Sequence, residues 1–239
     1  MEVELEAGGD RIRGEYSAPE GGPHPGVIVV HDARGYSDHV VGVVHELVAA
    51  GYAALAVDLY SRGAPAEDIT IPDLKDFVRS VADDQIVGDL QVAIDFLANA
   101  RAVQGGPIGL IGYCWGGTCA YLAAAHCEGL AAAVSWYGEL RTEVLNDRHP
   151  EHPMEALLAR RCPMLALFAE HDPYVLLPQV DELRERHARN PGEHELEIVL
   201  YPGVHHGFAH RGREHFDAPA HDDGWQRIHR LFDRELKRA

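Results

Sequence analysis

Residues 107–125 read PIGLIGYCWGGTCAYLAAA, and they contain the strongest structural signal in the chain. The short apolar run 107–111 predicts a buried strand, and residues 115–125 predict a helix that follows almost at once. Between them, residues 112–116 form the pattern Gly-x-Cys-x-Gly, which is the nucleophile-elbow motif with cysteine in the usual place of serine. A sharp turn from strand to helix strains the central residue, and flanking glycines leave room for it. The stretch therefore predicts an α/β fold in which the Cys114 thiol lies exposed at a helix N-terminus, a position that favours thiolate.

Outside this stretch, short apolar runs alternate with amphipathic segments. The runs that we expect to form strands are 27–30, 53–57, 130–135, 164–169 and 195–201. The last of these alternates in polarity and suits a strand near the sheet edge. The expected helices are 40–50, 86–100, 180–188 and 223–237, and residues 61–73 are expected to form a loop. The pattern predicts one domain, residues 1–239, with a mostly parallel sheet covered by helices on both faces and a ligand site beyond the carboxyl ends of its strands.

The overall composition is that of a globular protein with an acidic surface. The chain has 239 residues, of which 46% are hydrophobic, and 21 basic against 38 acidic side chains give a formal charge of −17. Such a charge argues against nucleic acid and against anionic membrane surfaces as partners. The N-terminal sequence MEVELEAGGD is not a signal peptide, and no run of about 20 apolar residues exists, so we expect a cytoplasmic protein.

The cysteines do not form a recognisable metal or redox motif. None of the four pairs as CxxC, which excludes the common zinc and thioredoxin-like patterns. A histidine cluster near the C-terminus could suggest a metal, but no HExxH or HxHxDH pattern accompanies it. We therefore expect no metal and no other cofactor. The cluster comprises His205, His206, His210 and His215.

A nucleophile needs a general base, and the base needs an acid that orients it. Candidates for the acid and for the base follow later strands. Strand 164–169 leads into Glu170 and Asp172, and strand 195–201 leads into His205 and His206. This order of nucleophile, acid and histidine is the one that the fold demands. Asp172 is the preferred acid, because it lies further into the loop and precedes a proline that fixes a turn, and Glu170 is the alternative. From these patterns alone, either histidine could be the base.

These residues resemble the dienelactone hydrolase (carboxymethylenebutenolidase) family of α/β-hydrolases, over nearly the whole chain from about Val27. The sequence GYCWGG at 112–117 carries the resemblance, and HGF at 206–208, EHDPYV at 170–175 and YG at 137–138 support it. The resemblance implies an α/β-hydrolase fold and a Cys-His-Asp catalytic triad. The triad residues would be Cys114, His206 and Asp172, so that His206 is chosen over His205.

The resemblance also implies groups that act on the thiol and on the reacting carbonyl. The family has an acid, usually Glu, that holds the resting thiol, and this chain has Asp32 there, in HDARG. The N–H groups of Ala33 and Trp115 would form the oxyanion hole.

Substrate binding is where the chain departs from the family. Dienelactone hydrolases hold the substrate carboxylate with arginines, and one of them should stand at the position of His210. For the other, only Lys75 and Arg79 are candidates. We expect Arg34, beside the oxyanion loop, to substitute, with Tyr36 and His210 as further substrate-binding residues.

The sequence thus predicts a hydrolase of a small ester or lactone that forms an acyl-enzyme on Cys114. Two alternatives remain at this point. One is a promiscuous carboxylesterase without lactone preference, and the other is a catalytically silent binding member of the family. Apart from the small-molecule substrate, we expect no partner, and a monomer or a weak homodimer.

Overall fold

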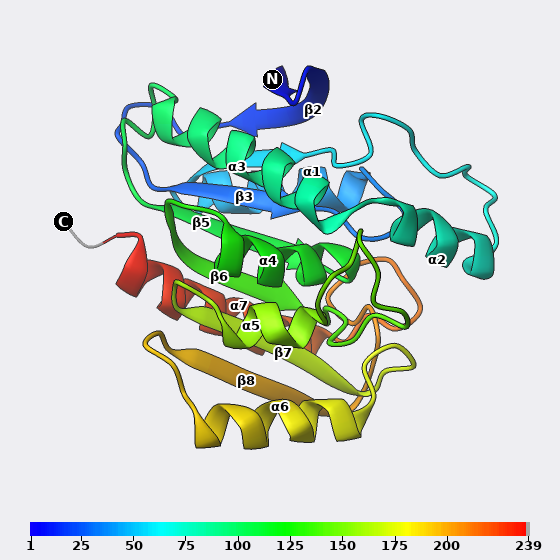
Figure 1. Cartoon of the computed structure of the whole chain (residues 1–239). Coiled ribbons are helices and arrows are strands. Elements are labelled where there is room, and N and C mark those ends of the chain that lie inside the picture. Colours follow the sequence, from blue (N-terminus) through cyan, green and yellow to red (C-terminus); the bar gives the residue numbers. More distant parts are fainter. Residues whose placement is uncertain (238–239) are drawn as a thin grey trace.

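The computed structural model describes residues 1–237, which fold around one eight-stranded sheet (Figure 1). The strand order is β1-β2-β4-β3-β5-β6-β7-β8. Strands β3 to β8 are mutually parallel, whereas β1 and β2 form an antiparallel hairpin on the β4 edge. The predicted mostly parallel sheet is confirmed. The strands are β1 (Glu2–Ala7), β2 (Asp10–Ser17), β3 (Gly26–Val30), β4 (Ala53–Val57), β5 (Ile108–Tyr113), β6 (Leu130–Trp136), β7 (Met164–His171) and β8 (Leu196–His205).

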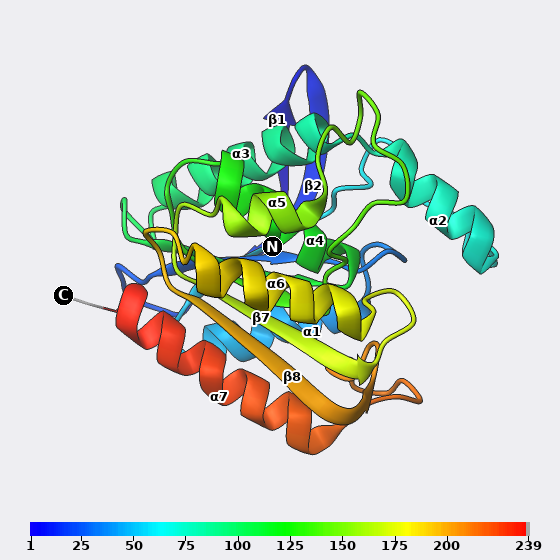
Figure 2. The same ribbon diagram turned by 60° about the horizontal axis from the view of Figure 1, so that its bottom comes forward.

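Helices cover both faces of this sheet, as Figure 2 shows from below. Helices α1 (Asp38–Ala49) and α7 (Ala218–Glu235) pack with Val27 and Val29 of β3 in one apolar core. The alternate β3 residues, Ile28 and Val30, belong to the core on the opposite face, because side chains along a strand point to alternate faces. The helices of that second face are α3 (Asp83–Asn99), α4 (Trp115–His126), α5 (Pro153–Leu158) and α6 (Leu177–Arg189). No helix within residues 1–237 is long and apolar enough to cross a membrane.

The structure contains elements that the apolar patterns did not predict. The β1–β2 hairpin alternates buried and charged positions and turns through Gly8 and Gly9, whose φ angles are +61° and +92°. Helix α2 (Ile71–Ser80) has a short apolar stripe, Ile71, Leu74 and Val78, of which only Leu74 is buried, and it begins inside the segment that was expected to be a loop. The expected edge position of β8 is confirmed.

The junction between β5 and α4 fixes where Cys114 lies. Cys114 has φ +54° and ψ −116°, a conformation that side chains rarely adopt. The turn is so tight that a Cβ on Gly112 would lie 1.8 Å from the Gly116 carbonyl oxygen. A Cβ on Gly116 would lie 2.4 Å from the carbonyl oxygen of His31, at the end of β3. The glycines are therefore required by backbone contacts that join α4 to the centre of the sheet.

This packing predicts that Gly116→Ala lowers the free energy of unfolding by about 3 kcal/mol, because the contacting atoms are backbone and cannot move aside. Gly88→Ala is the matched control, since nothing lies within 4 Å of a Cβ at this position in α3. That change should raise stability by about 0.5–1 kcal/mol, because alanine favours the helix. Urea unfolding measures both, and a Gly116→Ala variant as stable as the wild type would contradict the tight contact.

Candidate active site

The register of the sheet places three predicted residues at one edge. In β5 and β6, Tyr113 pairs with Trp136, and in β7 and β8, His171 pairs with His205. The next residue after each of β5, β7 and β8 is Cys114, Asp172 and His206 respectively. The carboxyl ends of parallel strands share one edge of a sheet, so these three side chains come from segments far apart in sequence to one place.

Cys114, His206 and Asp172 form one chain of contacts. His206 Nε2 lies 3.2 Å from Cys114 Sγ, and His206 Nδ1 lies 2.6 Å from Asp172 Oδ2. The other carboxylate oxygen, Asp172 Oδ1, accepts hydrogen bonds from the backbone N–H groups of Tyr174 (2.8 Å) and Val175 (3.1 Å). These bonds hold a buried carboxylate in a single orientation towards the imidazole.

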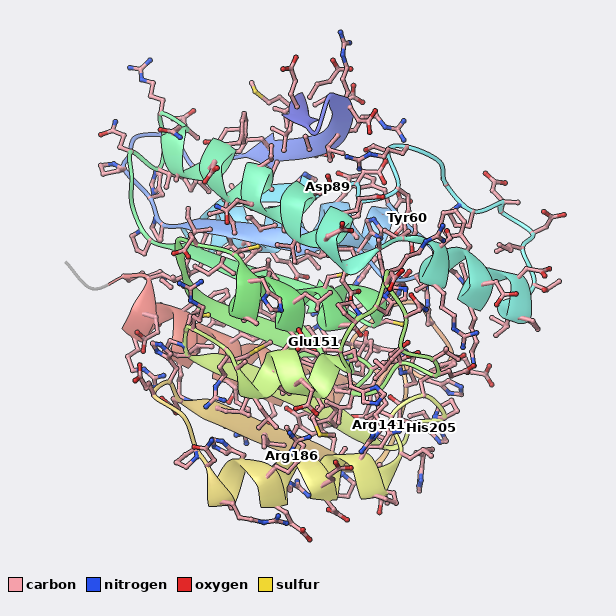
Figure 3. All side chains as sticks on the ribbon, in the orientation of Figure 1. Tyr60, Asp89, Arg141, Glu151, Arg186 and His205 are labelled. Atoms are coloured by element: carbon pink, nitrogen blue, oxygen red, sulfur yellow. The ribbon has the colours of Figure 1, made fainter. Side chains whose placement is uncertain are left out.

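The neighbouring candidates, Glu170 and His205, are used elsewhere. The Glu170 carboxylate accepts a hydrogen bond of 2.6 Å from the Gly203 N–H and so ties β7 to β8. The His205 ring lies 5.2 Å from that of His171 and stacks on His215 at 4.9 Å. His205 appears in Figure 3 on the side where the strands end. Within residues 1–237, no cluster of three or more His, Cys, Asp or Glu side chains is arranged to hold a metal.

The surroundings of His206 favour its protonated form. Burial alone would lower the pKa of His206, but the charges of Cys114 and Asp172, and the hydrogen bonds to them, outweigh burial and raise it. The rings of Tyr137 and Tyr174 pack edge-on against the imidazole, each at 4.8 Å. The arrangement thus keeps a proton on His206 beside the sulfur and restricts rotation of the ring.

A cavity of about 540 Å³ opens above Cys114. Helix α2 forms one wall, and Ala33 and Trp115 line the part next to the thiol. The N–H groups of Ala33 and Trp115 donate to no other group in the described residues, so both are free to bind an oxygen in the cavity. This is the placement expected of oxyanion donors.

Asp32 lines the cavity too, but its carboxylate is already engaged. Asp32 Oδ1 accepts from the Arg34 N–H at 2.8 Å, and Oδ2 lies 2.9 Å from Arg213 Nη2. Among the hydrogen bonds of residues 1–237, none joins Asp32 to Cys114, whose sulfur bonds His206 instead. Control of the thiol by Asp32 therefore stays a prediction, and it would act through charge rather than through a direct bond.

Two expected substrate-binding residues lie outside the cavity. The Tyr36 hydroxyl donates to the Glu15 carboxylate at 3.2 Å, which turns this ring towards β2. The ring centre of His210 lies 4.0 Å from that of His39, and the two rings stack in a separate pocket. The His210 N–H donates to the Gly207 carbonyl oxygen, so the loop after β8 turns at this point. Neither Tyr36 nor His210 lines this cavity, so their part in substrate binding stays a prediction. From the loop after β8, the cation that lines the cavity is Arg213.

The cavity contains charges that the patterns did not single out. Glu139 follows Tyr137-Gly138 beyond β6, and burial raises the pKa of its carboxyl group. The sequence signal that could have identified Glu139 is its position just past the carboxyl end of β6, where ligands bind in such sheets. Arg141, labelled in Figure 3, pairs with Glu182 at 2.6 Å. In contrast, Arg34 and Lys75 line the cavity without an ion pair in the described part of the chain.

Comparisons with known proteins agree on one family. Residues 12–236 match the dienelactone hydrolase family. A protein of Escherichia coli strain K12, named "putative carboxymethylenebutenolidase", is 33% identical over 94% of this chain and 83% of its own. One of the same name from Methylorubrum extorquens is 31% identical over 89% and 73%. A crystal structure described as a "putative dienelactone hydrolase" from Klebsiella pneumoniae superposes with a TM-score of 0.90, at 31% identity, over 97% of both chains.

The site geometry predicts that Cys114 is the fast-reacting thiol. The other three cysteines are buried; burial raises the pKa of Cys127 and of Cys162 to about 12 and that of Cys119 well above its ordinary value. Iodoacetamide at pH 7.5 should therefore label Cys114 first, by about 100-fold or more, because thiolate is the reactive form. Peptide mapping over time measures the order, and earlier labelling of another cysteine would contradict it.

Proposed function

The chain belongs to the dienelactone hydrolase family of α/β-hydrolases and acts on a lactone or ester, and we propose that it does so through an acyl-enzyme on Cys114. The observation that carries this proposal is the unbroken line of contacts from the Cys114 sulfur through His206 to Asp172. A nucleophile, a base and an orienting acid in that geometry are what acyl transfer requires.

In the first half of the reaction, the Cys114 thiolate attacks the substrate carbonyl carbon and the electron pair moves onto the carbonyl oxygen. The N–H groups of Ala33 and Trp115 stabilise this oxyanion. When the intermediate collapses, His206 transfers its proton to the departing alkoxide, and a thioester on Cys114 remains. For a lactone, the new alcohol stays attached to the acyl group.

In the second half, His206 accepts a proton from a water molecule, and the resulting hydroxide attacks the thioester carbonyl. The tetrahedral intermediate releases the Cys114 thiolate and a carboxylic acid, and His206 again holds a proton beside the sulfur. Asp172 remains ionised throughout. It fixes the imidazole tautomer and stabilises the imidazolium.

The cavity supports a small polar substrate. The name of the relatives favours a lactone, and the cavity carries two cations without acidic partners in the described residues, Arg34 and Lys75. We assign substrate binding to Arg34, whose exposed side chain lies beside the oxyanion loop. Lys75 Nζ lies 5.1 Å from the centre of the Tyr174 ring, next to His206.

The test of the proposed function is a hydrolysis screen of the purified protein against lactones, enol-lactones and aryl esters. Turnover of lactones or enol-lactones that disappears in Cys114→Ala is the expected result, because the thioester cannot form without the thiol. Activity on aryl esters alone would identify a carboxylesterase instead. No activity on any class, or full activity in Cys114→Ala, would overturn the mechanism.

We expect Asp172→Asn to reduce kcat by up to about 10⁴-fold, because an amide favours the wrong imidazole tautomer. Glu170→Gln is the matched control, since it makes the same chemical change two residues earlier, at a carboxylate that bonds Gly203 rather than a histidine. We expect this control to stay within about tenfold of the wild type, because it keeps an oxygen that can accept the same N–H. Steady-state kinetics measures both. A larger loss in Glu170→Gln than in Asp172→Asn would show that the acid is misassigned.

A further inference from the structure

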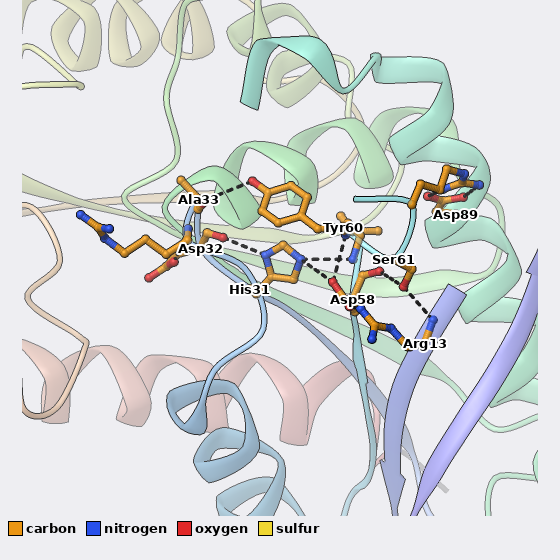
Figure 4. Close-up of polar contacts among 11 residues, drawn as sticks. Arg13, His31, Asp32, Ala33, Asp58, Tyr60, Ser61 and Asp89 are labelled. Atoms are coloured by element: carbon orange, nitrogen blue, oxygen red, sulfur yellow. Dashed lines mark hydrogen bonds and ion pairs between the residues drawn. The ribbon is translucent and has the colours of Figure 1, made fainter. Parts of the chain in front are cut away.

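His31, which no step of the proposed reaction uses, makes two directional hydrogen bonds at the site. It follows β3 directly, and its side chain is fully buried. His31 Nδ1 lies 2.8 Å from the Asp32 carbonyl oxygen, and Nε2 lies 3.1 Å from the Leu59 backbone nitrogen. Figure 4 shows the imidazole between Asp32 and Asp58, with its hydrogen bonds as dashed lines.

These partners define the protonation state of His31. A carbonyl oxygen only accepts, so Nδ1 must carry the hydrogen, and a backbone N–H only donates, so Nε2 must be bare. Burial lowers the pKa of His31, against the opposing effects of the Asp32 carbonyl and of the Asp58 and Asp32 carboxylates. Asp58 Oδ1 is 3.8 Å from Nε2, and the Asp58 carboxylate is itself held by Arg13 at 2.8 Å. The ring is thus a neutral imidazole with one fixed donor and one fixed acceptor.

The bond from Nδ1 acts on the peptide group that supplies an oxyanion donor. The Asp32 C=O and the Ala33 N–H belong to the same planar trans peptide, in which the two bonds point in opposite directions. Holding the Asp32 oxygen therefore aims the Ala33 N–H away from His31 and towards the cavity that Ala33 lines. The Gly35 N–H binds the same oxygen at 3.0 Å, and the Tyr60 hydroxyl binds the Ala33 oxygen at 3.2 Å.

His31 also contacts the residue that supplies the second donor. Its ring centre lies 5.6 Å from that of Trp115 and 4.6 Å from that of Tyr60. Its own carbonyl oxygen occupies the space where Gly116 would carry a Cβ. One residue thus contacts both segments that carry the Ala33 and Trp115 N–H groups.

We propose that His31 is the positioning residue of the oxyanion hole, acting through its Nδ1–H bond to the Asp32 carbonyl. This inference rests on the proposed function, because it assigns the Ala33 N–H to the oxyanion. His31 touches neither substrate nor thiol, so its effect is on kcat rather than on substrate binding.

Two substitutions separate the two ends of the imidazole. In His31→Asn, the amide nitrogen has the position of Nδ1 and can still donate to Asp32. In His31→Gln, the amide oxygen has the position of Nε2 and can still accept from Leu59, but the donor to Asp32 is lost. Both variants leave a space beside Tyr60 and Trp115, so urea unfolding should show similar destabilisation.

We expect His31→Gln to reduce kcat by about 10-fold to 100-fold with little change in KM, somewhat less than deletion of a whole oxyanion donor costs. His31→Asn should retain kcat within about threefold of the wild type, because its donor remains. Methyl methanethiosulfonate reports on the thiol independently, because its reaction involves no carbonyl. The rate at which it modifies Cys114 should stay within about twofold in both variants.

Three outcomes would overturn the inference: equal kcat losses in the two variants, an unchanged kcat in His31→Gln, or a modification rate that falls in parallel with kcat. If His31→Gln does not fold, Tyr60→Phe removes the tether on the Ala33 carbonyl alone. It should reduce kcat by about threefold at unchanged KM, since it loosens the next peptide, which Ala33 shares with Arg34, and an unchanged kcat there would count against the inference. A wild-type protein whose Cys114 reacts fast but which hydrolyses no ester or lactone would instead refute the proposed function.

Discussion

The first turn of α4 lies directly against the carbonyl oxygens of Val30 and His31, and there is no room for a side chain between them. This contact sets the depth at which α4 packs on the sheet and the point at which the chain turns at Cys114. The Cys114 N–H is held by the Trp136 carbonyl at 2.9 Å, so the strained residue is fixed from both sides. The strain at one residue is thus maintained by backbone packing across three strands.

The parallel register of β7 and β8 places the other two residues of the site. Because His171 pairs with His205, the residues that follow them, Asp172 and His206, are carried to the same height at the sheet edge. A side chain as short as that of Asp172 can therefore reach the imidazole, at 2.6 Å. Two backbone N–H groups donate to its other carboxylate oxygen. A shift of register by one residue would place different side chains there.

Two histidines near the thiol differ in pKa because their surroundings differ. His206 lies between a sulfur and a buried carboxylate, which raise its pKa and suit it to hold and move a proton. His31 is fully buried between a carbonyl oxygen and a backbone N–H, and its lowered pKa suits it to serve as a fixed neutral donor and acceptor. The chemical group is the same in both, and its partners decide whether its pKa rises or falls.

The amino-acid sequence determined the α/β architecture, the position of the elbow and the order along the chain of Cys114, Asp172 and His206, the candidates for nucleophile, acid and base. These features depend on local signals, namely apolar runs, the glycines around Cys114 and the loops after later strands. The β1–β2 hairpin and α2 are local elements as well, whereas the partners of each charge depended on contacts between distant segments. His205 and His206 are adjacent and chemically identical, and only their alternate directions at the end of β8 brought His206 to the sulfur. The same reason applies to Tyr36, His210 and Arg213: a side chain's direction depends on how its loop folds back, which one sequence position does not specify.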